Sequence, residues 1–321
     1  MRNRDSAAGW ILACVTLLAL ALLGADGDAR WPWLAFNWLA AVPMLLLFVP
    51  ECRTWARVRL AKHPSLAIHV PFALALYGMV AALLVGSHRW LNFLQWPVCV
   101  AVALAAVGRR HDDLDLSPGR MLLAAVALGT LAGIWERGLQ IRVPGGQHLS
   151  LAFLVGIDLA LLLFLVVRPL RTFDVGVGLT GREIGLALGA VAALAVVAIP
   201  AGFGLGFLSI QSRWIGLSHG VARLFGLIVF VGLPEELLFR GTIQEAFSRL
   251  WSPRIGLLLG SVVFGLVHLP KHAPPLNWRY AILATLAGLA YGWVYQKTGK
   301  LWAAALTHGS VDWIWSMFLG A

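Results

Sequence analysis

Long apolar runs alternate with short polar segments along almost the whole chain. A run of about 17 to 25 mainly apolar residues is long enough to cross the hydrocarbon core of a membrane as a helix. Eleven such runs occur, near residues 9–25, 31–49, 65–86, 90–108, 121–138, 149–167, 184–207, 217–239, 254–270, 278–296 and 300–319. The pattern predicts an all-α fold, a polytopic transmembrane helical bundle of about eleven spans.

The composition supports this prediction. Of the 321 residues, 60% are hydrophobic and only 12% are charged, a balance that soluble domains of this length do not carry. We therefore expect a multi-pass integral membrane protein. The bias toward Ala, Leu, Gly and Arg is typical of GC-rich bacterial genomes, which indicates a bacterial cytoplasmic membrane.

The positions of Lys and Arg predict the orientation, because short cytoplasmic loops collect positive charge. With the N-terminus inside, 17 of the 25 basic residues fall on the cytoplasmic side, which favours an N-in/C-out topology. This topology and contact with anionic lipid explain the net charge of +10, so the expected partner is a lipid bilayer and not nucleic acid. Cys14, Cys52 and Cys99 have no paired spacing and predict neither a disulfide framework nor a zinc-cysteine site.

The chain divides by chemistry near residue 175. Residues 1–175 are mostly Ala, Leu and Val within the runs, and we expect an N-terminal transmembrane region of about six spans without an assigned function. Asp158 and His69 are isolated polar residues there, and hydrogen bonding between helices is their simplest interpretation. In residues 176–321 the polar side chains within runs cluster, so this half carries the candidate chemistry.

Two adjacent carboxylates, Glu235 and Glu236, stand in the apolar stretch LIVFVGLPEELLFRGT. Ionisable groups at membrane depth are costly, and they mark a functional site by default. Glu236 and Arg240 are four residues apart on one helical face and can pair, which leaves Glu235 without a built-in partner. Carboxylates this close resist double ionisation, so one is suited to proton transfer. Pro234 weakens the helical hydrogen bonding beside them.

Two further motifs bring histidines to the following runs. FGLVH places Phe264 and His268 four residues apart, and HGSVD does the same for His308 and Asp312, so each pair shares a helical face. At about 1.5 Å per helical residue from the predicted inner surface, Glu235 and His268 lie roughly 20 Å deep, Asp312 roughly 18 Å and His308 roughly 12 Å. These groups can meet near mid-membrane if the helix bearing the glutamates continues through GTIQEAFSRL.

Such a site has the groups that hydrolysis requires. A glutamate can take a proton from water as general base, and imidazoles can donate hydrogen bonds to the oxyanion of a tetrahedral intermediate. The expected reaction is hydrolysis of a peptide bond or another acyl group.

The ordered motifs EExxxR, FxxxH and HxxxD resemble those of the CAAX protease and bacteriocin-processing family of intramembrane proteases, also called the Abi family. The resemblance covers approximately residues 178–321, and the flanking FRGT, FGLVHLP and KTGKLWAAALTH segments share it. It implies that residues 176–321 form a protease domain similar to type II CAAX prenyl endopeptidases. Such a hydrolase would cut a membrane-embedded or lipidated protein or peptide.

The resemblance also implies roles for individual residues. The catalytic set would be Glu235, Glu236, Arg240, His268, His308 and Asp312, with Phe264 packing the site. Glu235 would be the base that activates water, with Glu236 supporting it and paired to Arg240. The two histidines would position the water or stabilise the oxyanion.

Asp312 occupies a place that asparagine often holds in this family. A carboxylate cannot donate a hydrogen bond unless it is protonated, so Asp312 is expected to orient His308 or to add a metal ligand. We expect a glutamate-dependent mechanism without a cofactor. A zinc site formed by Glu235, His268, His308 and Asp312 is the open alternative.

Other interpretations of the polar cluster stay open. The EExxxR residues could form a buried ion pair that only fixes helix packing. The embedded Glu, His, Asp and Arg residues could instead form the pathway of a proton-coupled membrane transporter. A catalytically idle relative acting as a membrane immunity or interaction protein is a third alternative. The motifs do not predict the identity of the substrate.

Overall fold

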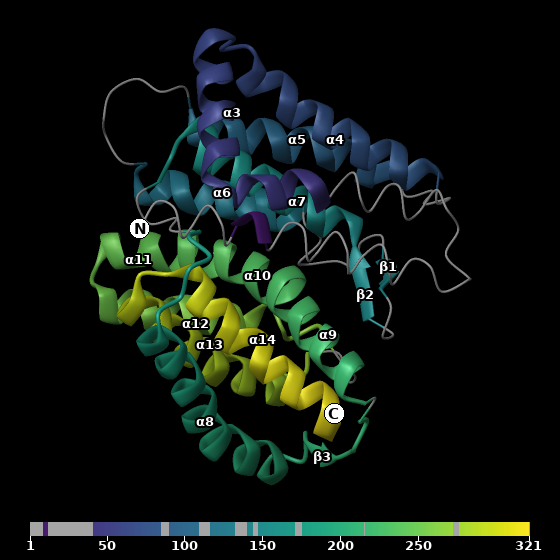
Figure 1. The fold of residues 1–321 in the computed structure, drawn as a ribbon, viewed down its shortest axis with the longest axis vertical. Coiled ribbons are helices and arrows are strands. Elements are labelled where there is room, and N and C mark those ends of the chain that lie inside the picture. The colour runs from purple at the N-terminus through teal and green to yellow at the C-terminus, as the bar shows by residue number, and fades with distance from the viewer. Residues whose placement is uncertain are drawn as a thin grey trace. The chain divides into compact units, whose positions relative to one another are not determined.

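The computed structural model describes residues 9–11, 41–84, 90–108, 116–131, 140–143, 147–170, 175–214, 216–271 and 276–320. The chain forms two compact units, Met1–Gly178 and Leu179–Ala321. Helices make up most of the described residues, which confirms the predicted all-α class (Figure 1). The predicted spans at 9–25 and 31–49 lie mostly outside the described residues, as does Cys14.

The first unit packs its helices in a layered bundle in which α5 contacts α4 and α6, and α7 contacts α4 and α6. Its elements are α3 (Pro50–Lys62), α4 (Leu66–Leu84), α5 (Trp90–Val107), α6 (Pro118–Leu131), β1 (Gln140–Val143), β2 (Gln147–Ser150), α7 (Leu151–Leu161) and the π-helical segment η1 (Leu162–Val167). The strands β1 and β2 form an antiparallel hairpin.

The two isolated polar residues of the first unit do not form the predicted contacts between helices. Asp158 is buried in α7, and neither of its carboxylate oxygens has a hydrogen-bond partner among the described residues. His69 is exposed on α4. Helical periodicity alone did not reveal which face of α4 packs inward, because that helix is apolar all round.

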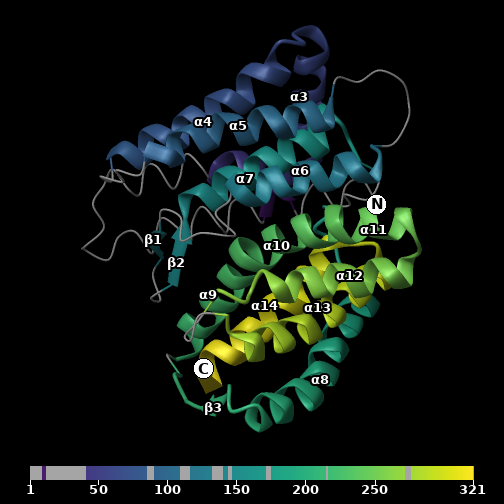
Figure 2. The same ribbon diagram turned by 180° about the vertical axis from the view of Figure 1, so that it is seen from behind.

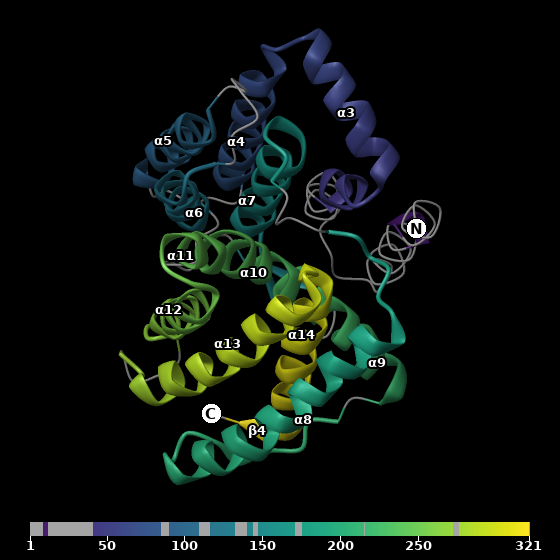
Figure 3. The same ribbon diagram turned by 90° about the vertical axis from the view of Figure 1, so that its left-hand side faces the viewer.

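The second unit holds all seven of the predicted site residues. Its elements are α8 (Gly181–Gly204), β3 (Ser209–Ile210), α9 (Leu217–Leu227), η2 (Ile228–Gly232), α10 (Leu233–Leu238), η3 (Phe239–Gln244), α11 (Glu245–Leu250), α12 (Pro253–Leu266), α13 (Trp278–Thr298), α14 (Leu301–Phe318) and β4 (Leu319–Gly320). Helix α13 packs between α12 and α14, an arrangement visible from both sides (Figures 1 and 2). Helix α14 also contacts α8 and α9, which are seen next to it in Figure 3.

Local sequence signals fix the ends of these helices. Thr180 caps α8 through a reciprocal pair of hydrogen bonds with Glu183, and Ser252 accepts a hydrogen bond from the first turn of α12. Asn277 caps α13 in the same way, while Gly299 ends it in the left-handed conformation that glycine adopts without strain.

Residues 217–250 form one helical stretch in which the π-helical segments η2 and η3 flank α10. The predicted continuation of the glutamate-bearing helix through GTIQEAFSRL is therefore present. The π-helical segments lie on both sides of the short helix that holds Pro234, and such turns occur often at functional sites.

Among the described residues, one helix, Gly181–Gly204, is long and apolar enough to cross a membrane. Pro50–Lys62 and Leu66–Val80 would add a second if they form one broken span, although they are bent by 117°. Helix α12 is apolar but shorter than predicted, since it ends at Leu266 and not near residue 270. The count of eleven spans and the N-in/C-out orientation stay predictions.

Candidate active site

Glu236 and Arg240 form a completely buried ion pair between α10 and η3, as predicted from their spacing. Nε of Arg240 lies 2.9 Å from Oε2 of Glu236, and both side chains have no exposed surface. The N–H is not aligned for a hydrogen bond, so this is a contact between charges. The guanidinium also lies over the rings of Phe264, at 5.1 Å, and Tyr291, at 6.0 Å. The ion pair is thus enclosed by aromatic side chains.

His308 links its own helix, α14, to Glu236 of α10. Its Nδ1 donates a hydrogen bond to Oε1 of Glu236 over 2.9 Å, because a carboxylate oxygen can only accept. Its Nε2 lies 3.5 Å from Oδ2 of Asp312 and 3.9 Å from Oε2 of Glu235. The Tyr291 ring stacks on the imidazole with 4.5 Å between centroids. His308 is therefore held by a stacked ring on one face and has carboxylates beside both nitrogens.

His268 lies in the turn after α12, two residues beyond the end of the helix. Its Nδ1 donates to the backbone carbonyl of Phe264 over 2.7 Å. The predicted pairing of these two positions is present, but through the main chain of Phe264 as well as its ring, which lies 4.6 Å from the imidazole. Since Nδ1 carries the proton, Nε2 of the neutral ring is a hydrogen-bond acceptor, and it lies 3.2 Å from Nζ of Lys271.

Phe264 packs the site from one side. It is 2% exposed, and its ring contacts both imidazoles, with 5.7 Å between its centroid and that of His308. Phe239 meets it edge to face at 4.9 Å. The residue therefore separates the two histidines and shields the ion pair behind them.

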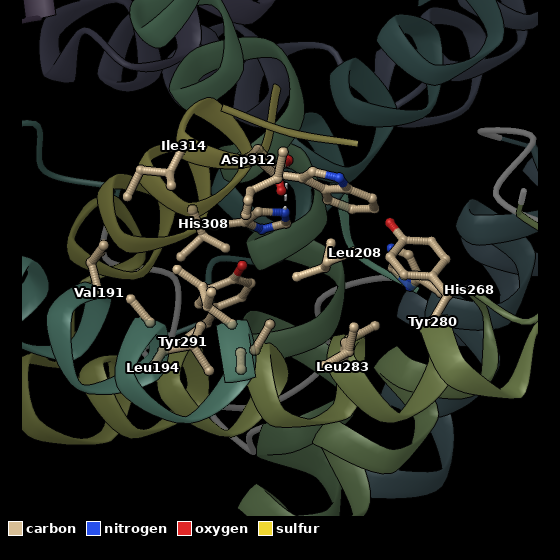
Figure 4. Close-up of a pocket in the computed structure, with 18 of the residues that line it drawn as sticks. Val191, Leu194, Leu208, His268, Tyr280, Leu283, Tyr291, His308, Asp312 and Ile314 are labelled. Atoms are coloured by element: carbon tan, nitrogen blue, oxygen red, sulfur yellow. Dashed lines mark ion pairs between the residues drawn. The ribbon is translucent and has the colours of Figure 1, made fainter. Parts of the chain in front are cut away.

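A cavity of about 170 Å³ opens in front of these side chains. Glu235, His268, His308 and Asp312 line it, whereas Glu236 and Arg240 do not. In Figure 4, His308 and Asp312 lie on one side of the cavity, and His268 and Tyr280 lie on the other. The remaining wall is mostly alkyl and aromatic, with α8 contributing residues such as Val191 and Leu194. The two adjacent glutamates thus differ in position, with one at the cavity and one behind it.

Two glycines allow the glutamates and His308 to approach each other. Gly309 of α14 lies against η2 so closely that an added methyl group would be 2.7 Å from the backbone nitrogen of Ile228. A methyl group on Gly232 would be 2.9 Å from the carbonyl oxygen of Ala305. Helix α14 therefore meets η2 and α10 backbone to backbone, which brings His308 within reach of Glu236.

The four residues predicted as alternative zinc ligands line the same cavity. Within the part of the chain that the structure describes, no group of three or more His, Cys, Asp or Glu side chains is placed to hold a metal ion. Nδ1 of His268 and Nδ1 of His308 are both engaged in hydrogen bonds within the protein. Histidines that hold zinc usually donate Nδ1–H in this way and bind the metal through Nε2, so these two bonds leave the zinc alternative open.

Lys271, Tyr280 and Tyr291 also line the cavity, and none of them was predicted from the sequence. Lys271 follows His268 by three residues, a spacing that returns both side chains to one side of a turn. Its Nζ lies 3.8 Å from Oε1 of Glu235. The ring of Tyr280 packs against His268 edge to face, at 5.1 Å.

Residues 217–314 match the model of one protein family, described as type II CAAX prenyl endopeptidase, Rce1-like. The matched segment runs from α9 into α14 and includes all seven predicted site residues. No curated protein and no solved structure matches the chain. The match confirms the family predicted from the three motifs.

Proposed function

Because residues 217–314 belong to the Rce1-like family of type II CAAX prenyl endopeptidases, we propose that the protein is an intramembrane endopeptidase. It hydrolyses a peptide bond in a membrane-associated or lipidated protein or peptide. The observation that carries the proposal is the division of labour between the adjacent glutamates. Glu235 faces the cavity, whereas Glu236 is buried in contact with Arg240 and His308.

In this proposal Glu235 is the general base. Its side chain is 13% exposed, so it meets water in the cavity while most of its surface is sheltered. Glu235 takes a proton from that water, the water oxygen attacks the carbonyl carbon, and the carbonyl electrons move onto oxygen. The tetrahedral intermediate then collapses, and Glu235 returns the proton to the leaving amine.

The supporting residues hold this arrangement in place. Glu236 compensates the charge of Arg240 and accepts the Nδ1 proton of His308, which fixes the orientation of that imidazole. Asp312 lies beside Nε2 of the same ring, consistent with an orienting role. Because Nε2 of neutral His268 is an acceptor that lies 3.2 Å from Nζ of Lys271, it is suited to orient that lysine and not to stabilise an oxyanion.

The size and chemistry of the cavity suggest how a substrate is held. A dry cavity of about 150 Å³ in another protein holds one benzene ring, so the 170 Å³ here fits one apolar side chain beside the scissile bond. The remainder of a lipid chain or transmembrane segment would then lie outside it. Helix α8, which is long and apolar enough to cross a membrane, contributes part of the apolar wall.

Cleavage by the purified protein in liposomes tests the proposal. The panel consists of an internally quenched peptide bearing a farnesylated cysteine three residues before its C-terminus and a single-span transmembrane peptide. Wild type should cleave at least one of them, and Glu235→Gln and Glu235→Ala should reduce kcat by about 10²- to 10⁴-fold, as loss of a general base does. Glu245→Gln, which removes a carboxylate paired with Arg249 on α11, is the matched control.

The proposal fails if the Glu235 variants cleave as well as wild type. A pH-dependent ion flux into the liposomes, without cleavage of any peptide, would support the transporter interpretation instead. An inactive wild type that shows no flux would support the idle relative.

A further inference from the structure

Position 312 does not supply the hydrogen-bond donor that this chemistry requires. An oxyanion needs N–H or O–H groups aimed at it. An ionised Asp312 would repel an oxyanion and would lie next to His308 as an acceptor only. The cavity is also lined by side chains that carry donors, namely Lys271, Tyr280, Tyr291, His308 and Trp315. Among them, Lys271 has an ammonium whose Nζ lies 3.8 Å from Oε1 of Glu235.

His268 does not supply it in the neutral state. Its Nδ1 proton is committed to the Phe264 carbonyl, so the nitrogen that faces the cavity is an acceptor. That nitrogen receives a hydrogen bond from Lys271, whose ammonium has three N–H groups. The imidazole thus orients the lysine, and the lysine presents further N–H groups to the cavity that both residues line.

Lys271 is placed where the reaction is expected to occur. Its Nζ lies 3.2 Å from Nε2 of His268 and 3.8 Å from Oε1 of Glu235, the proposed base. The separation from Glu235 is longer than a hydrogen bond, and the lysine side chain is 40% exposed. A carbonyl oxygen whose carbon is attacked by a water bound to Glu235 can therefore approach the ammonium.

We propose that Lys271 is a catalytic residue whose ammonium stabilises the oxyanion. The inference rests on the proposed hydrolysis. When water attacks, its proton goes to Glu235, the new C–O bond forms, and the carbonyl π electrons move to oxygen. Lys271 donates an N–H to that oxygen throughout and keeps its own proton. As the C–N bond breaks, Glu235 protonates the leaving amine and the oxyanion reverts to a carbonyl.

Substitution of Lys271 tests this role with the full-length protein in liposomes and the same two peptides. Lys271→Met should lower kcat by about 10²- to 10³-fold, the usual cost of removing one oxyanion donor, with KM changed less than about threefold. Lys271→Arg should retain more activity than Lys271→Met, because it keeps the charge. Lys297→Met on the exposed end of α13 is the matched control and should match wild type.

A double-variant comparison tests how the role of Lys271 depends on Asp312. Asp312→Asn introduces a neutral donor, so Lys271→Met should cost less in kcat in that background than in wild type. This dependence separates an oxyanion role from a structural one, since a packing defect would not be relieved at position 312. If Lys271→Met does not fold, as judged by thermal unfolding, Lys271→Gln carries the same comparison.

Three results would overturn the inference. One is a Lys271→Met variant with kcat within about threefold of wild type. Another is a Lys271→Met variant whose KM rises, with kcat unchanged, for peptides that end in a free carboxylate but not for the corresponding amides. This result would assign Lys271 to binding the C-terminus of the substrate. A wild type that cleaves neither peptide overturns the proposed function and the inference together, whereas either of the first two leaves the proposed function intact.

Discussion

His308 Nδ1 donates to Oε1 of Glu236 over 2.9 Å, although the two residues are 72 positions apart in the sequence. The bond joins α14 to α10, and Arg240 contacts the other oxygen of the same carboxylate. One buried carboxylate thus serves two partners, a histidine at the cavity and an arginine enclosed by aromatic rings. Its loss should affect folding as well as catalysis, whereas loss of Glu235 should affect catalysis alone.

Glu236→Gln should destabilise the protein by about 3–5 kcal/mol, because it leaves the buried charge of Arg240 without its counter-ion. Thermal or denaturant unfolding in detergent measures this change. Glu235→Gln is the matched control and should change stability by less than about 1 kcal/mol, since the contacts of Glu235 are long and partly exposed. Equal stability losses for the two variants would contradict the division of roles.

Removing both partners of the buried pair should cost less than removing one. In the double variant Glu236→Gln, Arg240→Met no charge is left buried without a partner, so its stability should exceed that of Glu236→Gln by about 1 kcal/mol or more. The same unfolding measurement on the two single variants and the double variant completes the cycle. Additive losses would mean that the 2.9 Å contact contributes no coupling.

Gly309→Ala should lower both stability and activity. The added methyl group meets the backbone of Ile228 at 2.7 and 2.8 Å, so α14 must move away from η2 and carry His308 from Glu236. Overpacking of this kind typically costs about 1–3 kcal/mol. Gly185→Ala on α8, where an added methyl group meets nothing within 4 Å, is the control and should leave cleavage unchanged. Full activity of Gly309→Ala would show that this close approach is not required.

Chelation should leave cleavage unchanged. In the proposed mechanism Glu235 itself activates the water, so no step needs a bound metal. Peptide cleavage is measured after dialysis against EDTA and again after zinc is added. Loss of activity in EDTA followed by recovery in zinc would establish the zinc site instead.

The sequence predicted well those features of the site that are local in the chain. Glu236 and Arg240, and likewise His308 and Asp312, are four residues apart, so helical geometry alone brings each pair together. The three motifs are also local in the chain, and the family that they predicted matches the segment that carries them.

Features that depend on where a helix ends, or on how two helices cross, were not predicted. The run ending in FGLVHLP is apolar beyond Leu266, so hydropathy could not reveal that α12 stops there and that Lys271 turns back toward Glu235. The π-helical turns around α10 and the contact between Gly309 and η2 arise from tertiary packing, for which periodicity carries no signal.

The end of α12 decides which nitrogen of His268 holds the proton. In an uninterrupted α-helix the backbone N–H of residue 268 would bond to the carbonyl of Phe264, four residues earlier. Here that N–H bonds to the carbonyl of Gly265, which leaves the Phe264 oxygen for the imidazole. In a regular helix the imidazole would have to share that acceptor with the main-chain N–H. The place where the helix ends thus favours one tautomer of His268, and it does so through main-chain atoms that no substitution of the Phe264 side chain removes.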